Sequence, residues 1–462
     1  MAPTQKEKAA SRVEGIIANP RRAVWKLAVP VMLGMGLHTL YNVTDMIFVG
    51  RLGGDEVAAL SFSMPLVFFT IGITFGLGTG ATSVIARLLG AGRKEAADNA
   101  ARHALLIGFG IGGVFVVAAL LWKREIMGLL GTSGEVMDLA VQYFEIVAPG
   151  FIFTILNTSF RSIMAGEGNT ITPIAFQASG TVLNIILDPV FIFWAGMGIS
   201  GAAWATVVSQ FLVFALFAVH IFVRRGTFLD LSFSDFTPSA RIAKDILRVG
   251  LPASGSMVIM SVGGMCTNWI VSISGSAAVA GLGIGGRLES IYFMPTFALA
   301  LSQVTLAGMF LGAGRIDLIR KTMVYTMLWG QVMAVSFGVV FYFFAEPLCA
   351  IFTSDEQIIA VAVSYIRVIA LAFPFVTVGL ISGRVFQGLG SGLPGLVTTS
   401  LRVVVISVPL AYLFTRVLGL GLTWVWGAFA VAGLISSVVA VVWVQRRLRQ
   451  VEGELAAERP AV

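Results

Sequence analysis

The amino-acid sequence predicts an all-α membrane protein with about twelve transmembrane helices in two pseudo-symmetric six-helix lobes. Three observations predict this architecture: an apolar composition, apolar stretches long enough to cross a bilayer, and a second half that repeats landmarks of the first. Together they argue against a soluble globular domain and against a β-barrel.

The composition leaves too little polar surface to meet water. Hydrophobic residues make up 57% of the 462 positions and charged residues 12%, whereas a soluble domain carries about 25% charged residues. Lipid must therefore surround most of the chain. The two cysteines belong to no disulfide framework or Cys/His metal pattern, and we expect no cofactor.

Near-continuous apolar stretches of roughly 20 residues or more recur along the chain. They must be helices, because each crossing has to satisfy its own backbone in lipid and the stretches lack the alternation of barrel strands. We place them near 24–49, 57–86, 100–122, 138–163, 170–194, 200–223, 246–273, 278–311, 322–344, 358–384, 394–415 and 424–445.

The positive charges predict the topology. The net charge is +7, but most Lys and Arg residues lie in the two tails and in alternate loops, as the positive-inside rule requires. We therefore expect no nucleic-acid partner. We expect a monomer with many crossings of the inner (plasma) membrane, surrounded by lipids, with both termini cytoplasmic. The expected parts are a cytoplasmic N-tail (1–23), an N-lobe (24–223), a cytoplasmic linker (224–245), a C-lobe (246–445) and a cytoplasmic C-tail (446–462).

The two halves match at a constant shift of 222 residues. Pro30 then meets Pro252, and "LGAGR" at 89–93 meets "LGAGR" at 311–315. Each half holds an even number of crossings, so the repeat is parallel, about an axis along the membrane normal. Two such lobes suit alternating access around a site between them, which is how secondary transporters work.

Polar side chains inside the apolar stretches gather in the first half. Burying charge in lipid is costly, so intramembrane ionisable residues are functional candidates. Asp45 stands in "LYNVTDMIF", with Tyr41 about one turn earlier. Asp188 stands in "LNIILDPVF", with Asn184 one turn earlier. Thr206 is the fifth candidate.

The second half does not repeat the carboxylates. At the 222-residue shift, Asp45 corresponds to Thr267 and Asp188 to Leu410. One lobe alone therefore keeps the acidic groups, which an ion-coupling site in that lobe would explain. The alternative is that these side chains only hydrogen-bond neighbouring helices.

Such carboxylates can couple transport to either of two ions. A low-dielectric environment favours a neutral carboxyl group, so proton uptake is one possibility. Na⁺ is the other, held by oxygens of Asp45, Asp188, Asn184 and Thr206. The sequence does not separate the two. A cavity with acidic groups in a low-dielectric wall attracts lipophilic cations, which predicts small amphipathic, mostly cationic substrates.

A few other residues in the apolar stretches have distinct expected roles. Pro30 removes one backbone hydrogen bond and is a candidate conformational hinge, the alternative being a static kink. Glu289 lies near Arg287, which can pair with it, and Arg402 falls within a predicted crossing.

The chain resembles the multidrug and toxic compound extrusion (MATE) family, and most closely its DinF-like prokaryotic branch. The resemblance spans residues 20–449 and rests on "LAVPVMLGMGLHTLYNVTDMIFVGRLG", "IARLLGAGRKEAADN", "MAGEGNTITP", "LNIILDPVFIF" and "GISGAAWAT". It implies twelve helices in two lobes and export driven by H⁺ or Na⁺. The acidic residues typical of the NorM-like branch are not evident in the C-lobe, which favours the DinF-like assignment.

The resemblance also carries residue roles. The matching cation-site positions are Tyr41, Asp45, Asn184, Asp188 and Thr206, with Pro30 as the bending position. A polar Asn is expected in the fourth crossing, and Asn157 fits it, although Arg161 stands a turn away where some members have another Asn.

Two alternatives remain. One is a flippase for lipid-linked oligosaccharides or lipids from the same superfamily, although such proteins typically line the cavity with cations. The other is a receptor, channel or membrane enzyme. The sequence has no HExxH, P-loop or GxSxG motif, so we do not expect an enzyme.

Overall fold

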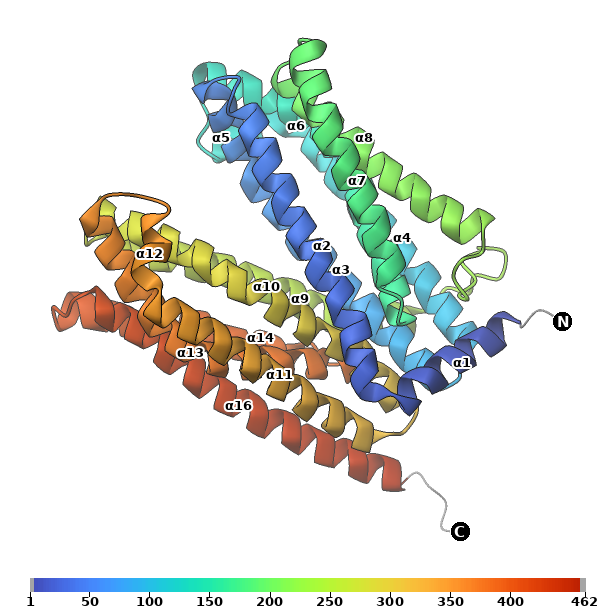
Figure 1. The fold of residues 1–462 in the computed structure, drawn as a ribbon. Helices are drawn as coiled ribbons and strands as arrows, with labels where there is room; N and C mark the ends of the chain where they lie inside the picture. Colours follow the sequence, from blue (N-terminus) through green and yellow to red (C-terminus); the bar gives the residue numbers. More distant parts are fainter. Residues whose placement is uncertain (1–3, 458–462) are drawn as a thin grey trace. The chain divides into compact units, whose positions relative to one another are not determined.

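The computed structural model describes residues 4–457, apart from the side chain of residue 42, and it is helical throughout its regular structure (Figure 1). Twelve helices are long and apolar enough to cross a membrane, which confirms the predicted fold class.

The helices of the first half are α1 (Gln5–Ala18), α2 (Pro20–Val49), α3 (Gly54–Gly90), α4 (Lys94–Leu121), α5 (Lys123–Leu129), α6 (Gly134–Gly166), α7 (Ile171–Pro189) with the π-turn η1 (Val190–Trp194), and α8 (Ile199–Ala218) with η2 (Val219–Val223). Those of the second half are α9 (Ala240–Ser272), α10 (Ser276–Gly312), α11 (Ile316–Phe343), α12 (Ala345–Ala350), α13 (Glu356–Gly388), α14 (Leu393–Ser400), η3 (Leu401–Ile406), α15 (Ser407–Tyr412), η4 (Leu413–Val417) and α16 (Leu422–Ala457).

Several helices extend beyond the predicted apolar stretches. The last one was expected to end near residue 445, but α16 continues to Ala457 through a charged segment. Arg, Gln, Glu and Leu are good helix formers, so the helix does not stop where the apolar pattern stops. Exposed ion pairs along this extension, such as Arg447–Glu454 with an N–O distance of 3.0 Å, are compatible with it.

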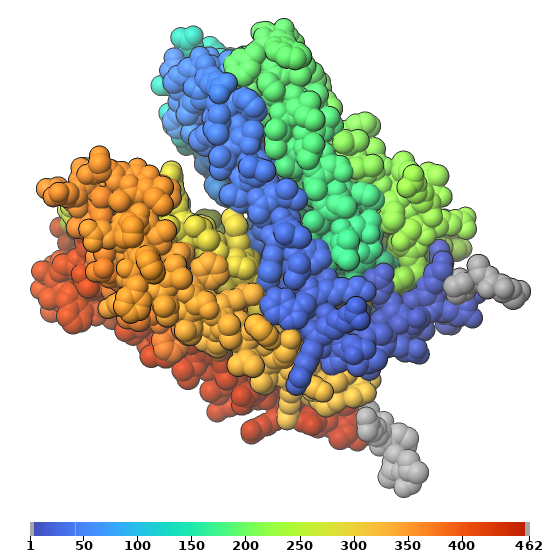
Figure 2. Space-filling model, in the orientation of Figure 1, coloured from blue at the N-terminus to red at the C-terminus, as the bar shows by residue number. Residues whose placement is uncertain are grey.

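The first compact unit comprises residues up to Glu14 together with Val29–Gly250. Within it α6 packs against α3, α4 and α8. Helix α7 packs against α8, and their green surfaces adjoin in Figure 2. Glycines permit this close approach. A Cβ at Gly180 on α7 would lie 2.3 Å from a methyl carbon of Val213 on α8.

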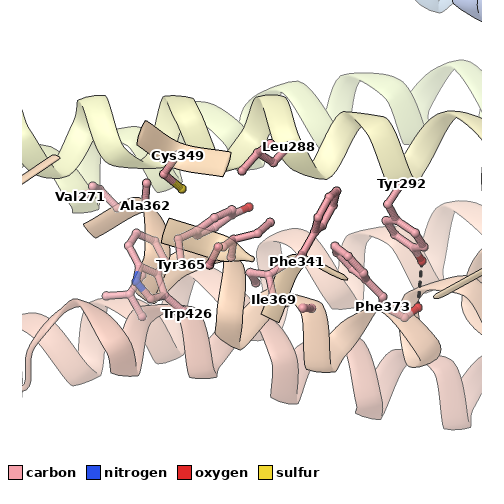
Figure 3. Packing of buried hydrophobic residues seen from close by; sticks show 14 of the residues in the cluster. Val271, Leu288, Tyr292, Phe341, Cys349, Ala362, Tyr365, Ile369, Phe373 and Trp426 are labelled. Carbon is pink, nitrogen blue, oxygen red and sulfur yellow. Dashed lines mark hydrogen bonds between the residues drawn. The ribbon is translucent and has the colours of Figure 1, made fainter. Parts of the chain in front are cut away.

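The second compact unit comprises Gly15–Ala28 and the chain from Leu251 onward. Its core lies mainly between α10, α11, α13 and α16 (Figure 3). There the ring of Tyr292 stacks on Phe373 with centroids 3.8 Å apart, and its hydroxyl donates to the Phe373 carbonyl at 2.9 Å. The first turns of α2 belong to this unit, where Trp25 Nε1 donates to the Tyr325 hydroxyl at 3.1 Å.

The segment between η2 and α9, predicted as a linker, folds onto the first unit. The amide of Asn99 donates to the carbonyl of Thr237 at 2.9 Å, and Arg102 Nη1 donates to the carbonyl of Asp235 at 3.0 Å. Glu167, in the "GEG" turn after α6, accepts from the backbone N–H of Leu229 at 3.1 Å and from the Thr227 hydroxyl.

This arrangement buries the Glu167 carboxyl. Burial raises its pKa to about 7, although the hydrogen bonds from Thr227 and Leu229 act in the opposite direction. Desolvation of the carboxylate is thus the larger effect on this pKa. The two hydrogen bonds stabilise the charged form by less than burial destabilises it.

Substituting Gly201→Ala should strongly destabilise the first unit. A Cβ there would lie 2.6 Å from the backbone carbonyl carbon of Phe191, and backbone atoms cannot move aside as a flexible side chain can. Gly110→Ala on α4 is the matched control, since a Cβ there meets nothing within 4 Å. Melting temperatures of the purified variants in detergent test this; equal values for both would contradict the packing.

Substituting Glu167→Gln should remove part of the pH dependence of stability. The pKa of Glu167 is about 7 in the folded chain against 4.5 for an ordinary glutamate. As pH rises, the folded chain therefore keeps the Glu167 proton to a higher pH than the unfolded chain does. The wild-type contribution therefore falls as pH rises from about 4.5 to about 7 and then levels off.

Thermal melts across this pH range measure the effect. The difference between wild type and Glu167→Gln should follow that window, whereas the exposed Glu135→Gln should give a curve parallel to wild type. A pH-independent difference between wild type and Glu167→Gln would contradict the buried carboxyl.

Candidate functional site

A cavity within the first unit is lined by residues of α2, α7 and α8. Three of the residues predicted from the sequence line it: Tyr41, Asn184 and Thr206. The hydroxyls of Tyr41 and Thr206 share a hydrogen bond at 3.2 Å, which joins α2 to α8 across the cavity wall. Residues far apart in the chain therefore line one cavity.

The carboxylates of Asp45 and Asp188 are buried beside the polar residues that line this cavity. Asp188 is 0% exposed and Asp45 is 8% exposed. The amide of Asn184 donates to Asp188 Oδ1 at 3.3 Å. Asp45 and Asp188 also interact electrostatically with each other and with the hydroxyls of Tyr41 and Tyr143. The four oxygen-bearing groups therefore form one charged cluster.

Local sequence explains where Asp188 lies. It precedes Pro189, which closes α7 and cannot donate a hydrogen bond to the carbonyl four residues earlier. The π-turn η1 follows directly, and such turns are frequent at functional sites. Asn184 lies one turn before Asp188, so its amide reaches the carboxylate within the same helix.

Asn157 contacts the cavity wall through Gln210. Its amide donates to the backbone carbonyl of Gln210 at 3.0 Å and to the side-chain oxygen of Gln210 at 3.2 Å. Gln210 itself lines the cavity. Asn157 thereby links α6 to α8, while the neighbouring Arg161 is exposed and interacts electrostatically with His38.

Pro30 lies apart from the cavity cluster. It is inside α2, which continues as a helix on both sides of it. The chain passes from the second unit to the first between Ala28 and Val29, immediately before this proline. Its position fits a bending point, and its role as a hinge remains a prediction.

Some charged residues have partners that the sequence did not indicate. Glu145 forms an ion pair with Lys123, with an N–O distance of 2.7 Å. Glu289 accepts a hydrogen bond from the Tyr365 hydroxyl at 2.6 Å, and within residues 4–457 it forms no ion pair with Arg287. The expected Glu289–Arg287 pairing was therefore wrong. Tyr143, near both carboxylates, was missed as a site residue, because its match with Tyr365 marked it only as part of the repeat.

The cluster suits a monovalent cation better than a transition metal. In the described part of the chain, no group of three or more His, Cys, Asp or Glu residues gathers. Among the buried oxygens without a hydrogen-bond partner are Asp45 Oδ1, Asp188 Oδ2 and Asn184 Oδ1. Carboxylate and amide oxygens are hard donors that suit Na⁺, and a carboxylate oxygen can equally take up a proton.

Comparison with known proteins identifies the family. The MatE family model matches residues 30–190 and again 252–413, two copies whose starts are separated by the repeat shift found in the sequence. The chain belongs to the MatE (MATE) family. This membership also establishes a multi-pass membrane protein, given its twelve apolar helices.

Relatives agree over nearly the whole chain. A probable multidrug resistance protein, NorM, of Thermotoga maritima is 28% identical over 91% of this chain and 90% of its own length. A solved MOP superfamily transporter from Pyrococcus furiosus is 30% identical, with a TM-score of 0.89 over 94% of this chain and 97% of that one. A MATE structure described as the bent conformation is also 30% identical, with a TM-score of 0.91 over 96% and 99%.

Proposed function

We propose that this MATE-family chain is a secondary active antiporter, coupled to H⁺ or Na⁺, that exports amphipathic, mostly cationic drugs or toxic organic compounds by alternating access. One observation carries the proposal: two buried carboxylates with unpartnered oxygens lie beside a polar cavity in a membrane-spanning helix bundle. The relative from Thermotoga maritima is named a multidrug resistance protein, which supports the substrate class.

Electrostatics links the two transported species. An ionised carboxylate in a low-dielectric site needs a compensating positive charge, supplied by H⁺, by Na⁺ or by a cationic substrate. Because Asp45 and Asp188 interact with each other, a cation bound at one carboxylate weakens the attraction of the other carboxylate for a second cation. Coupling ion and substrate therefore compete, and competition for one set of charges is the basis of antiport.

Each neighbouring residue has a proposed part in this competition. Asn184 holds Asp188 in place by donating to one of its oxygens. The Tyr41–Thr206 hydrogen bond fixes the hydroxyls that line the cavity wall, and Asn157 holds Gln210. Na⁺ would use the free oxygens of Asp45, Asp188 and Asn184, with Thr206 as a further donor, whereas H⁺ needs only a carboxylate oxygen.

Pro30 is the proposed bending position of α2. Its ring nitrogen has no N–H to donate along the helix, which lowers the cost of bending there. The similar MATE structure described as bent supports this part of the proposal. Neutralising Asp45, which lies on the same helix, would change how that helix packs against α8.

The coupling test replaces each carboxylate by its neutral isostere. Asp45→Asn and Asp188→Asn keep size and most hydrogen bonding but remove the charge, so export of a cationic dye from proteoliposomes should fall to the protein-free background. If these side chains only joined helices, Asn would nearly suffice, since intramembrane hydrogen bonds average about 0.6 kcal/mol. Imposing pH and Na⁺ gradients separately identifies the coupling ion.

The matched control is Thr267→Val, the position equivalent to Asp45 in the second half, which should leave export near wild type. Dye binding measured beside export separates loss of coupling from loss of folding. Full export by both Asn variants would contradict the coupling role. If expression protected cells from none of a broad cationic panel and instead restored a lipid-linked sugar pathway, the flippase would replace the antiporter.

We propose further that the protein is a monomer of the inner (plasma) membrane with both termini cytoplasmic, since the positive charges gather in the tails and alternate loops. Alkaline phosphatase fused after Val462 should be inactive, because that enzyme works only in the periplasm, and green fluorescent protein at the same point should fluoresce. The reverse result would invert the topology.

A further inference from the structure

The second unit contains its own cavity, of about 70 Å³, and two arginines line it. Arg384 comes from α13 and Arg402 from η3, and both lie within membrane-crossing segments. No Asp or Glu is among its lining residues. Nothing in the proposed cation exchange uses this cavity, so its charge needs a separate explanation.

Arg384 is held in a defined position. Its side chain is buried, Nη1 donates to Gln387 Oε1 at 2.8 Å, and the guanidinium lies 4.7 Å from the centroid of the Phe297 ring. Gln387 and Phe297 line the same cavity. A neutral amide and an aromatic ring orient the cation without cancelling its charge.

Arg402 is only partly compensated. It interacts electrostatically with Glu289, whose carboxylate accepts the hydrogen bond from Tyr365 and does not line the cavity. The lining of the cavity thus carries two guanidinium groups and no carboxylate. Guanidinium groups keep their charge in proteins, so the cavity has a net positive character.

The repeat shows that the scaffold does not require Arg402. At the 222-residue shift, Arg402 corresponds to Gly180 and Thr399 to Gln177, and each member of these pairs lines the cavity of its own unit. The two cavities therefore occupy equivalent places. The first has acidic groups beside it, and the second has basic groups.

We propose that the second-unit cavity binds organic anions that carry an apolar body: amphiphiles with a carboxylate, phosphate or sulfonate head. Arginine forks match such heads geometrically. The hydroxyls of Thr398 and Ser436 also line the cavity, and Met257 and Met260 offer an adaptable apolar wall. This site is separate from the Asp45–Asp188 cluster of the first unit and does not rest on the antiport proposal.

The experiment compares charged and neutral ligands of matched shape on the full chain in phosphatidylcholine nanodiscs. One arm uses dioctanoyl phosphatidylglycerol against dioctanoyl phosphatidylcholine, which tests a lipid source. The other uses naphthalene-2-sulfonate against 2-naphthalenemethanol, which tests a soluble anion. In at least one arm the anion should bind about tenfold more tightly than its neutral partner. Equal affinities in both arms would overturn the proposal.

Variants then locate the site. Arg402→Gln and Arg402→Gly, the latter copying Gly180, should each weaken anion binding by about tenfold, and Arg384→Gln should do the same. If Arg384→Gln does not fold, Arg384→Lys keeps the charge and should bind better than the Arg402 variants. The control is Arg367→Gln, an exposed arginine on the same α13 outside the cavity. The assignment would be overturned if only the control lost anion binding. It would also be overturned if every variant bound the anion as tightly as wild type.

Discussion

Inside a hydrocarbon layer a polar group has no water to bond, and this constraint governs the whole molecule. The backbone meets it by forming helices, in which each N–H and C=O is satisfied along the chain. Side chains meet it by pairing, as Tyr292 does with the Phe373 carbonyl and Asn157 does with Gln210. Asp45 Oδ1 and Asp188 Oδ2 are among the buried atoms without a hydrogen-bond partner, and they are informative because an unpaired carboxylate oxygen is costly inside the membrane.

The sequence was sufficient for what depends on periodicity and charge. Apolar length predicted the twelve crossings. The family resemblance, not helical spacing, grouped Tyr41, Asn184 and Thr206 as one site, and these three residues line one cavity. Contacts that depend on how helices are rotated and tilted could not be predicted. Hydropathy does not say that Tyr143 approaches the carboxylates, nor that Glu289 meets Tyr365 and not its sequence neighbour.

The internal repeat separates scaffold from specialisation. Equivalent positions can pack differently in the two halves. Gly180 is where α7 touches Val213, while its counterpart in the second half is Arg402 beside an open space. The repeat thereby supplies two equivalent cavities. One has acidic groups beside it and the other has basic groups, although equivalent helices contribute to both.

The chain crosses between its two compact units at 14/15, 28/29 and 250/251, and each of these points lies inside a helix, α1, α2 or α9, not in a loop. The connections are therefore helical at these points and contain no loop. A change of angle between the units has to strain backbone hydrogen bonds, which gives any such change a restoring force that loose loops would not provide. Pro30 and Pro252 follow two of these points at equivalent places, where a missing N–H makes the helix most compliant.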